Sequence, residues 1–221
     1  MNRSHSYNPV RLVLFAVVLA SVLLSTPHSA FVTTTKAQGP TPPNTPLPHN
    51  VSAPPVYDDF NDNTVNSTRW RNYLAGSGPT FAETNQRLEI SIPASSSGTL
   101  FLAGLTSTCH LSGDFDIQVS YQLLNWPAKS GVRVGLSPGW AVERASLSDR
   151  EGAPTPLREV YVMDGWDGLT ATGDQSGKLR LVRAGSTMTG YYYAGSWIPV
   201  ASRTRTTGPV AFFIAAWSHD W

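Results

Sequence analysis

Cysteine is nearly absent from this sequence, because Cys109 is the only one among 221 residues. A single cysteine cannot form a disulfide within the chain, and it excludes a zinc centre built from several thiolates. A folded domain must therefore depend on its hydrophobic core. Cys109 follows Thr108 at the end of a strand pattern, so we expect its side chain to be small, buried and unreactive.

Charge is also scarce, and neither sign dominates. Asp, Glu, Lys and Arg make up 14% of the chain. From Val56 to Trp221 there are 13 Lys and Arg against 15 Asp and Glu, so this part carries a net charge near −2. A nucleic-acid-binding protein needs a stripe of basic residues. The sequence has none, so we do not expect nucleic acid to be a partner.

The chain has no apolar run of the length that a membrane-spanning helix needs. Leu12–Leu24 has thirteen residues, which is too short to cross a bilayer comfortably, and it follows the basic residues Arg3 and Arg11. This pattern is typical of a secretory signal. We expect a signal peptide and cleavage region over residues 1–37, and a secreted, extracellular or cell-envelope protein. If the segment is not cleaved, it would be the protein's one contact with a membrane.

Proline is concentrated in one place. Residues 38–55 contain the segment Gly39–Pro55, in which seven of seventeen residues are proline. Proline fixes φ and removes a backbone donor, so this segment is predicted to be an extended, semi-rigid spacer. The remaining residues, 56–221, are enough for one domain with a sizeable core.

The domain is dominated by alternating strand patterns. Within Asp114–Trp126, apolar residues occupy every second position, and polar residues lie between them. Similar segments recur every ten to fifteen residues without a long helical period, which predicts an antiparallel β-sandwich. Strands are expected at 56–60, 69–74, 81–83, 87–92, 99–106, 115–125, 131–136, 140–146, 159–164, 169–172, 178–183, 189–194, 198–203 and 209–217. Val210–Trp217, within the last of these, is apolar on both faces, so we expect a central strand and we expect Trp217 to lie in the core.

Several motifs carry a resemblance to a known family: YDDFND at 57–62, TRW at 68–70, RLEI at 87–90, GDFDIQV at 113–119, GVRVGL at 131–136 and SGKLRLVR at 176–183. With these motifs, residues 56–221 resemble the concanavalin A-like lectin/glucanase superfamily, including laminin-G-like domains of exported bacterial proteins. The resemblance implies an all-β jelly roll of two antiparallel sheets. Such domains usually end in a closing strand with an Asp-Asn-Phe segment. This chain stops before one, so we expect either a fragment or a sandwich without its last strand.

Catalysis is not indicated by the carboxylates. A glycosidase places two of them on either side of the scissile bond, roughly 5–10 Å apart. Enzymes that share the implied fold often carry Glu-x-Asp-x-x-Glu or Glu-x-Asp-x-Glu on one strand, and neither motif occurs here. Glu143 and Glu159 form the best pair available, predicted to lie on strands opposite the apolar register with Arg133 nearby. A solvated sheet face with a salt link explains them more simply.

Carbohydrate binding requires fewer precisely placed residues than catalysis does. Sugar rings stack on Trp or Tyr, and planar polar groups fix the hydroxyls. The loop Asp164-Gly165-Trp166-Asp167-Gly168 combines an indole, two carboxylates and two glycines, so it predicts either a sugar platform or a plain turn. The candidate ligand-binding residues are Trp166, Asp164, Asp167, Trp140, Arg133, Tyr161 and Glu159.

A structural calcium ion is a further candidate. Asp58, Asp59, Asn61 and Asp62 gather oxygen atoms in one short stretch, and domains of the resembled superfamily often hold calcium. Asp59 and Asp62 are the candidate ligands, and capping of a turn is the alternative. The leading prediction is a non-catalytic, lectin-like module that binds carbohydrate or polysaccharide. The alternatives are a glycoside hydrolase and a protein-binding adhesion or structural module.

Overall fold

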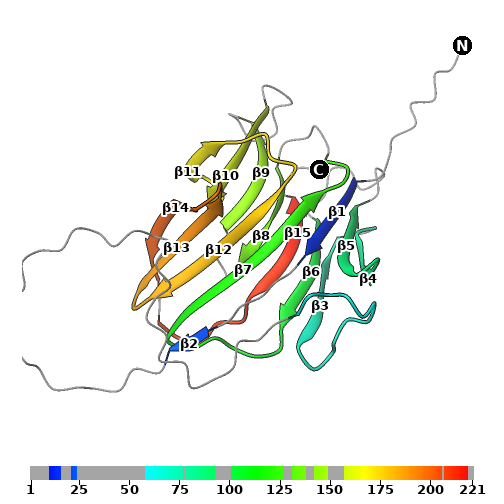
Figure 1. Ribbon diagram of the computed structural model, residues 1–221, viewed down its shortest axis with the longest axis horizontal. Helices are drawn as coiled ribbons and strands as arrows, with labels where there is room; N and C mark the ends of the chain where they lie inside the picture. Colours follow the sequence, from blue (N-terminus) through cyan, green and yellow to red (C-terminus); the bar gives the residue numbers. More distant parts are fainter. Residues whose placement is uncertain are drawn as a thin grey trace, which may run out of the picture.

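The computed structural model describes residues 58–76, 78–92, 101–126, 131–137, 142–148, 157–205 and 207–218, together with the backbone of 10–15 and 21–23. These residues form two antiparallel sheets that pack face to face (Figure 1). No helix occurs among them, and therefore none that is long and apolar enough to cross a membrane. The predicted all-β sandwich of two antiparallel sheets is confirmed. The predicted spacer, residues 38–55, lies outside the described residues.

The first sheet is built around the long strand β7. Its strands follow one another in space in the order β14 (Trp197–Thr204), β13 (Thr187–Tyr193), β12 (Ser176–Ala184), β7 (Asp114–Leu123), β1 (Val10–Phe15), β5 (Arg87–Ile92) and β4 (Thr80–Thr84). The short β2 (Ser21–Leu23) pairs with the beginning of β7. β1 comes from the predicted signal segment, and it was not among the expected strands.

The second sheet covers the first, and β15 is one of its central strands, between β8 and β6. The spatial order is β11 (Asp167–Ala171), β10 (Leu157–Met163), β9 (Val142–Ser148), β8 (Val132–Ser137), β15 (Phe213–Ser218), β6 (Phe101–Ser107) and β3 (Trp70–Ala75). The prediction that the strand near the C-terminus is central is therefore confirmed.

Alternation along the strands decides which side chains enter the core. On β7, Ile117, Val119 and Tyr121 are buried, whereas Gln118 and Ser120 between them are half-buried. We call the face that each sheet turns toward the other its core face, and the opposite face its outer face. The core faces of both sheets contribute to one continuous cluster of buried apolar residues. Burying this surface is the main favourable term in folding.

Three expectations from the sequence are wrong. No strand runs through Asp58–Phe60, because Phe60 has a positive φ of 51° and turns its ring onto Trp70, 5.6 Å between centroids. Cys109 is exposed, because it lies in the turn that follows β6. Trp217, expected in the core, is half-buried, because its register opposite Arg133 puts it on the outer face.

Candidate functional site

The two glutamates that formed the best catalytic pair lie on opposite faces of the second sheet. Glu143 on β9 is directly opposite Val162 on β10, and Glu159 is opposite Ser146. Directly opposed residues share a face and neighbours in sequence alternate. Glu143 is therefore on the outer face, and Glu159 is on the core face with Tyr161. The expectation of a shared face is wrong, and the pair cannot flank one glycosidic bond.

Glu143 is held in a buried ion pair. Its carboxylate accepts a hydrogen bond from Arg133 Nη1 at 2.6 Å, and the two side chains are 4% and 8% exposed. Burial raises the pKa of Glu143 to about 7, although the nearby charge of Arg133 favours the carboxylate. Arg133 Nη1 also donates to the carbonyl of Gly165 at 3.4 Å. Arg133, predicted to bind ligand, thus supports the turn between β10 and β11.

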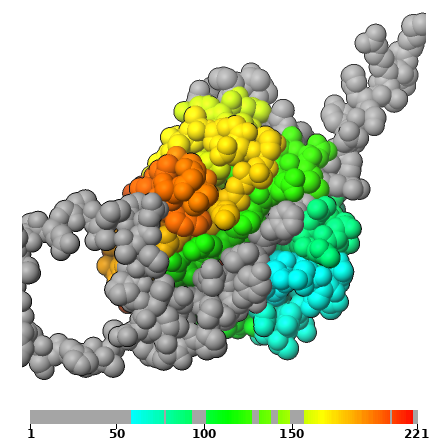
Figure 2. Space-filling model, viewed as in Figure 1, coloured from blue at the N-terminus to red at the C-terminus, as the bar shows by residue number. Residues whose placement is uncertain are grey.

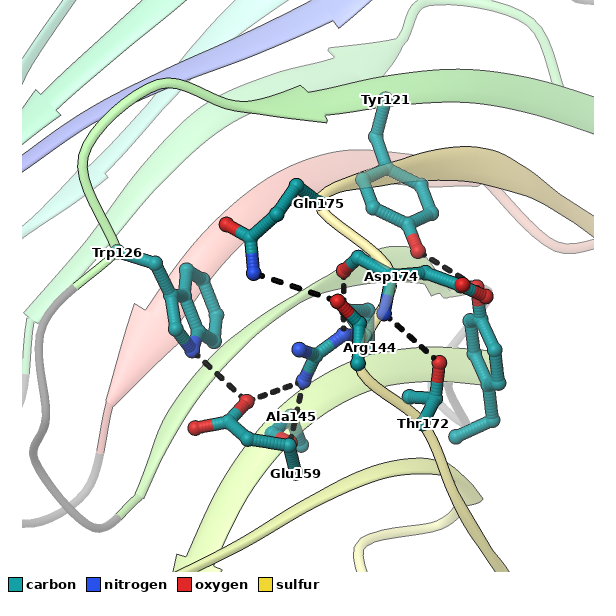
Figure 3. Close-up of polar contacts among 10 residues, drawn as sticks. Tyr121, Trp126, Arg144, Ala145, Glu159, Thr172, Asp174 and Gln175 are labelled. Carbon is teal, nitrogen blue, oxygen red and sulfur yellow. Dashed lines mark hydrogen bonds and ion pairs between the residues drawn. The ribbon is translucent and has the colours of Figure 1, made fainter.

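Glu159 belongs to a group of contacts centred on Arg144, which we call the arginine cluster (Figure 3). Arg144 is fully buried and pairs with Glu159, while its Nη1 donates to the carbonyl of Ala145 at 2.9 Å. Its guanidinium carbon lies 5.6 Å from the ring centroid of Trp126, whose Nε1 donates to Glu159 at 3.0 Å. Asp174 contributes its backbone carbonyl to Arg144 Nε at 3.2 Å.

Tyr161 joins this cluster to the first sheet. Its hydroxyl lies 2.7 Å from that of Tyr121 on β7, and it donates to Asp174 at 2.8 Å. Burial raises the pKa of Tyr121 to about 12 and that of Tyr161 well above its ordinary value. Both phenols therefore stay protonated near neutral pH. Because these contacts bridge β7 and β10, the arginine cluster ties the two sheets together.

The loop between β10 and β11 is clamped by charge. Asp164 pairs with Arg205, and Asp167 pairs with Arg203. Burial raises the pKa of Asp164, and Arg205 opposes this by favouring the carboxylate. Both predicted carboxylate ligands thus hold the loop to the region of β14. Trp166 between them remains 51% exposed, so the loop presents a single indole to solvent.

The remaining candidates are Trp140, predicted to bind ligand, and Asp59 and Asp62, predicted to bind calcium. Trp140 lies outside the described residues. Asp59 accepts a hydrogen bond from Asn61 Nδ2 at 2.6 Å, and Asp62 accepts one from the backbone N–H of Thr64 at 2.9 Å. These contacts match the turn-capping alternative. Within the described part of the chain, no three His, Cys, Asp or Glu residues lie close enough together to hold a metal ion.

A second group of aromatic residues lies on the outer face of the first sheet. We call it the aromatic face, and it comprises Asp116, Lys178, Arg180, Tyr191, Tyr193 and Trp197. The register places Tyr191 opposite Arg180, and Tyr193 opposite Trp197. In Figure 2 the orange atoms of β13 and β14 border the yellow and green atoms of β12 and β7 on this side of the molecule.

The charged groups of the aromatic face are fixed against its rings. Arg180 donates to both carboxylate oxygens of Asp116, at 2.9 and 2.5 Å. The guanidinium carbon of Arg180 lies 5.6 Å from the ring centroid of Tyr191 and 5.5 Å from that of Trp197. The bidentate ion pair fixes the orientation of the planar guanidinium group between the two rings.

The rim of the aromatic face is open to solvent. Tyr193 is 39% exposed and packs edge-on against Trp197, with centroids 5.2 Å apart at 71°. The exposed Lys178 places its Nζ 5.1 Å from the centre of the Tyr193 ring. The arrangement thus offers partly exposed rings beside fixed and flexible cations.

This face was not among the sites predicted from the sequence, because the candidate ligand-binding motif lay in a loop. The sequence did contain a signal for it. Lys178 and Arg180 are two residues apart and so share a face of their strand, and the same holds for Tyr191 and Tyr193. The two strands are consecutive and are joined by the Gly185-Ser186 turn. Comparisons of the chain with family models, with curated proteins and with solved structures find no match.

Proposed function

We propose that this protein is a lectin-like, non-catalytic carbohydrate-binding module, and that the aromatic face is its binding surface. One observation carries the proposal: three aromatic rings and two cations gather on the solvent-facing side of β12, β13 and β14. Pyranose rings bind aromatic side chains through their apolar C–H faces, and planar donors fix the hydroxyl groups. At this surface the exposed Lys178 supplies a donor, whereas Arg180 is 7% exposed and gives its Nε and Nη2 to Asp116, so it orders the rings of Tyr191 and Trp197.

The same contacts favour binding over hydrolysis. Asp116 is the carboxylate of the aromatic face, and both of its oxygens accept hydrogen bonds from Arg180. It therefore lacks the freedom that a nucleophile or general acid needs. Glu143 and Glu159 are separated by the sheet itself. The proposed module is exported by its N-terminal segment and belongs with the concanavalin A-like domains that it resembles.

The test is a screen of the full chain against immobilised polysaccharides and a glycan array. The variant is Tyr193→Ala, and the matched control is Tyr73→Ala. Tyr73 lies on the other sheet, is 38% exposed, and stacks on Phe213 at 4.7 Å, so both substitutions remove a similarly exposed ring. We expect glycan binding to be lost with Tyr193→Ala and kept with Tyr73→Ala.

Three outcomes would overturn the proposal. Equal binding by the two variants would show that the aromatic face is not the binding surface. Release of reducing sugar from a bound polysaccharide would instead identify a hydrolase, the alternative predicted from the sequence. Absence of any glycan ligand, together with capture of a specific protein that depends on Tyr193, would identify an adhesion module.

A further inference from the structure

β1 occupies a central position in the first sheet. Its residues Val10–Leu14 pair antiparallel with β5, and Leu12–Phe15 pair antiparallel with β7. In Figure 1 the blue arrow of β1 lies between these two strands, and β5 is next to β4 on its other side. The link between the β7 half and the β5 half of this sheet therefore passes through β1.

Removal of β1 would leave a slot one strand wide. Neighbouring strands lie about 4.8 Å apart, so the backbones of β5 and β7 would face each other across roughly 9.6 Å. Both would expose a row of unpaired N–H and C=O groups. The slot would also open beside buried core residues, Leu88 and Ile90 on β5 and Tyr121 on β7. An extended segment is needed there to complete the sandwich.

The sequence of β1 fits the register of this slot. Val10, Leu12 and Leu14 are opposite Ile92, Ile90 and Leu88, which are all on the core face. Arg11 is opposite Ser91 at an outer-face position. In this register the aliphatic residues of β1 are paired with core-face residues of β5, and the single charged residue is paired with an outer-face residue.

The same residues begin the predicted signal segment. Val10–Phe15 overlaps the apolar run Leu12–Leu24, which was assigned to export. One molecule cannot use this segment in the sheet and in a membrane at the same time. Cleavage in the predicted region before residue 38 would remove the covalent link to the domain, although it would not touch the backbone hydrogen bonds of β1.

We propose that the slot between β5 and β7 is a strand-acceptor site, and that Val10–Phe15 is its exchangeable occupant. Recognition is by main-chain hydrogen bonds to both neighbouring strands, with alternate aliphatic side-chain positions setting the register. The ligand class is an extended peptide with the alternation of Val10–Phe15. The slot does not depend on carbohydrate binding, because it involves none of the residues of the aromatic face.

The test begins with the full chain carrying a protease site within residues 39–55. After cutting, we expect the N-terminal fragment to co-elute with the domain in gel filtration. A fluorescent peptide of residues 8–17 added in excess should release the fragment and raise the peptide's anisotropy. The variant is Leu14→Pro, in fragment and peptide alike. Leu14 is opposite both Leu88 and Tyr121, and proline at that central position removes a ladder donor. The matched control is Asn8→Pro, which precedes the strand.

We expect the Leu14→Pro fragment to separate on cutting and the Leu14→Pro peptide to bind at least tenfold more weakly, while Asn8→Pro behaves as wild type. A second measurement uses uncut protein, in which Leu14→Pro should increase hydrogen exchange of the amides in β5 and in the end of β7. The proposal is overturned if the wild-type fragment separates on cutting without change in melting temperature. It is also overturned if the Leu14→Pro and wild-type peptides bind equally.

Discussion

The arginine cluster and the aromatic face are built from the same kinds of residue. In the first, Arg144 pairs with Glu159 and lies 5.6 Å from the ring of Trp126. In the second, Arg180 pairs with Asp116 and lies 5.5 Å from the ring of Trp197. The first group lies between the two sheets, whereas the second lies on the outer face of one sheet.

We propose that this difference in position separates a stabilising role from a binding role. Arg144 contacts backbone carbonyls of Ala145 and Asp174, so its donors are directed to the protein itself. The aromatic face instead leaves Tyr193 and Lys178 in contact with solvent. An arginine, a carboxylate and an indole therefore do not define a site by themselves. Their place relative to the core decides whether they are directed to the protein itself or lie beside solvent-exposed groups.

The largest expected effect is on the arginine cluster. Arg144→Ala leaves the carboxylate of Glu159 without its cation and removes the contacts that join β9 to Asp174. We expect the free energy of unfolding to fall by about 3 kcal/mol, at the lower end for a broken buried pair because Glu159 is partly exposed. Denaturant unfolding measures this. Glycan affinity of the folded fraction should be unchanged. If Arg144→Ala instead lost glycan affinity and kept wild-type stability, the arginine cluster would be a binding site and not a structural one.

The second effect concerns pH and the buried pair Arg133–Glu143. Burial raises the pKa of Glu143 to about 7, so between about pH 4.5 and 7 the folded protein retains a proton that the unfolded chain has released. This proton's contribution to stability is present in full below about pH 4.5 and is lost as pH rises through 7, by roughly 3 kcal/mol. Glu143→Gln should flatten this part of the stability curve. Parallel curves for wild type and variant from pH 5 to 8 would contradict the assignment.

The third effect distinguishes Trp197 of the aromatic face from Trp126 of the arginine cluster. Trp197→Ala removes a ring that contacts both Arg180 and Tyr193, and we expect glycan binding to weaken by about 1–3 kcal/mol, the range for stacking on an aromatic side chain. Trp126→Ala should reduce stability and leave glycan affinity unchanged. Calorimetric titration of both variants checks this, and the comparison fails if Trp126→Ala is the one that loses affinity.

The smallest effect is expected at the loop between β10 and β11. Trp166 is half exposed, and the ion pairs of Asp164 and Asp167 hold the loop without it. Trp166→Ala should change stability by less than about 0.5 kcal/mol. If the aromatic face is the binding surface, glycan affinity is also unchanged. A loss of 1–3 kcal/mol in affinity would instead support the sugar platform predicted for this loop from the sequence.

The alternation of side chains predicted most of the fold, because a strand that is buried on one face has apolar residues at every second position of its own sequence. It located β5, β7 and β12 to within two residues at each end. β1 was missed because its apolar residues also fit a signal segment, and only pairing with β5 and β7 distinguishes the two. The faces of Glu143 and Glu159 depend on the register between β9 and β10, which neither strand specifies alone. The aromatic face likewise depends on how β12, β13 and β14 align.

We propose that the outer face of β12, β13 and β14 binds carbohydrate. The most direct test of this proposal is NMR titration of the isotope-labelled protein with a glycan identified by the array, following backbone amides and the indole N–H groups. We expect shifts clustered at Lys178, Arg180, Tyr191, Tyr193 and Trp197, with the indole signals of Trp126 and Trp166 unchanged. Shifts confined to Trp166 and its loop, with no shifts in the aromatic face, would contradict the proposed binding surface.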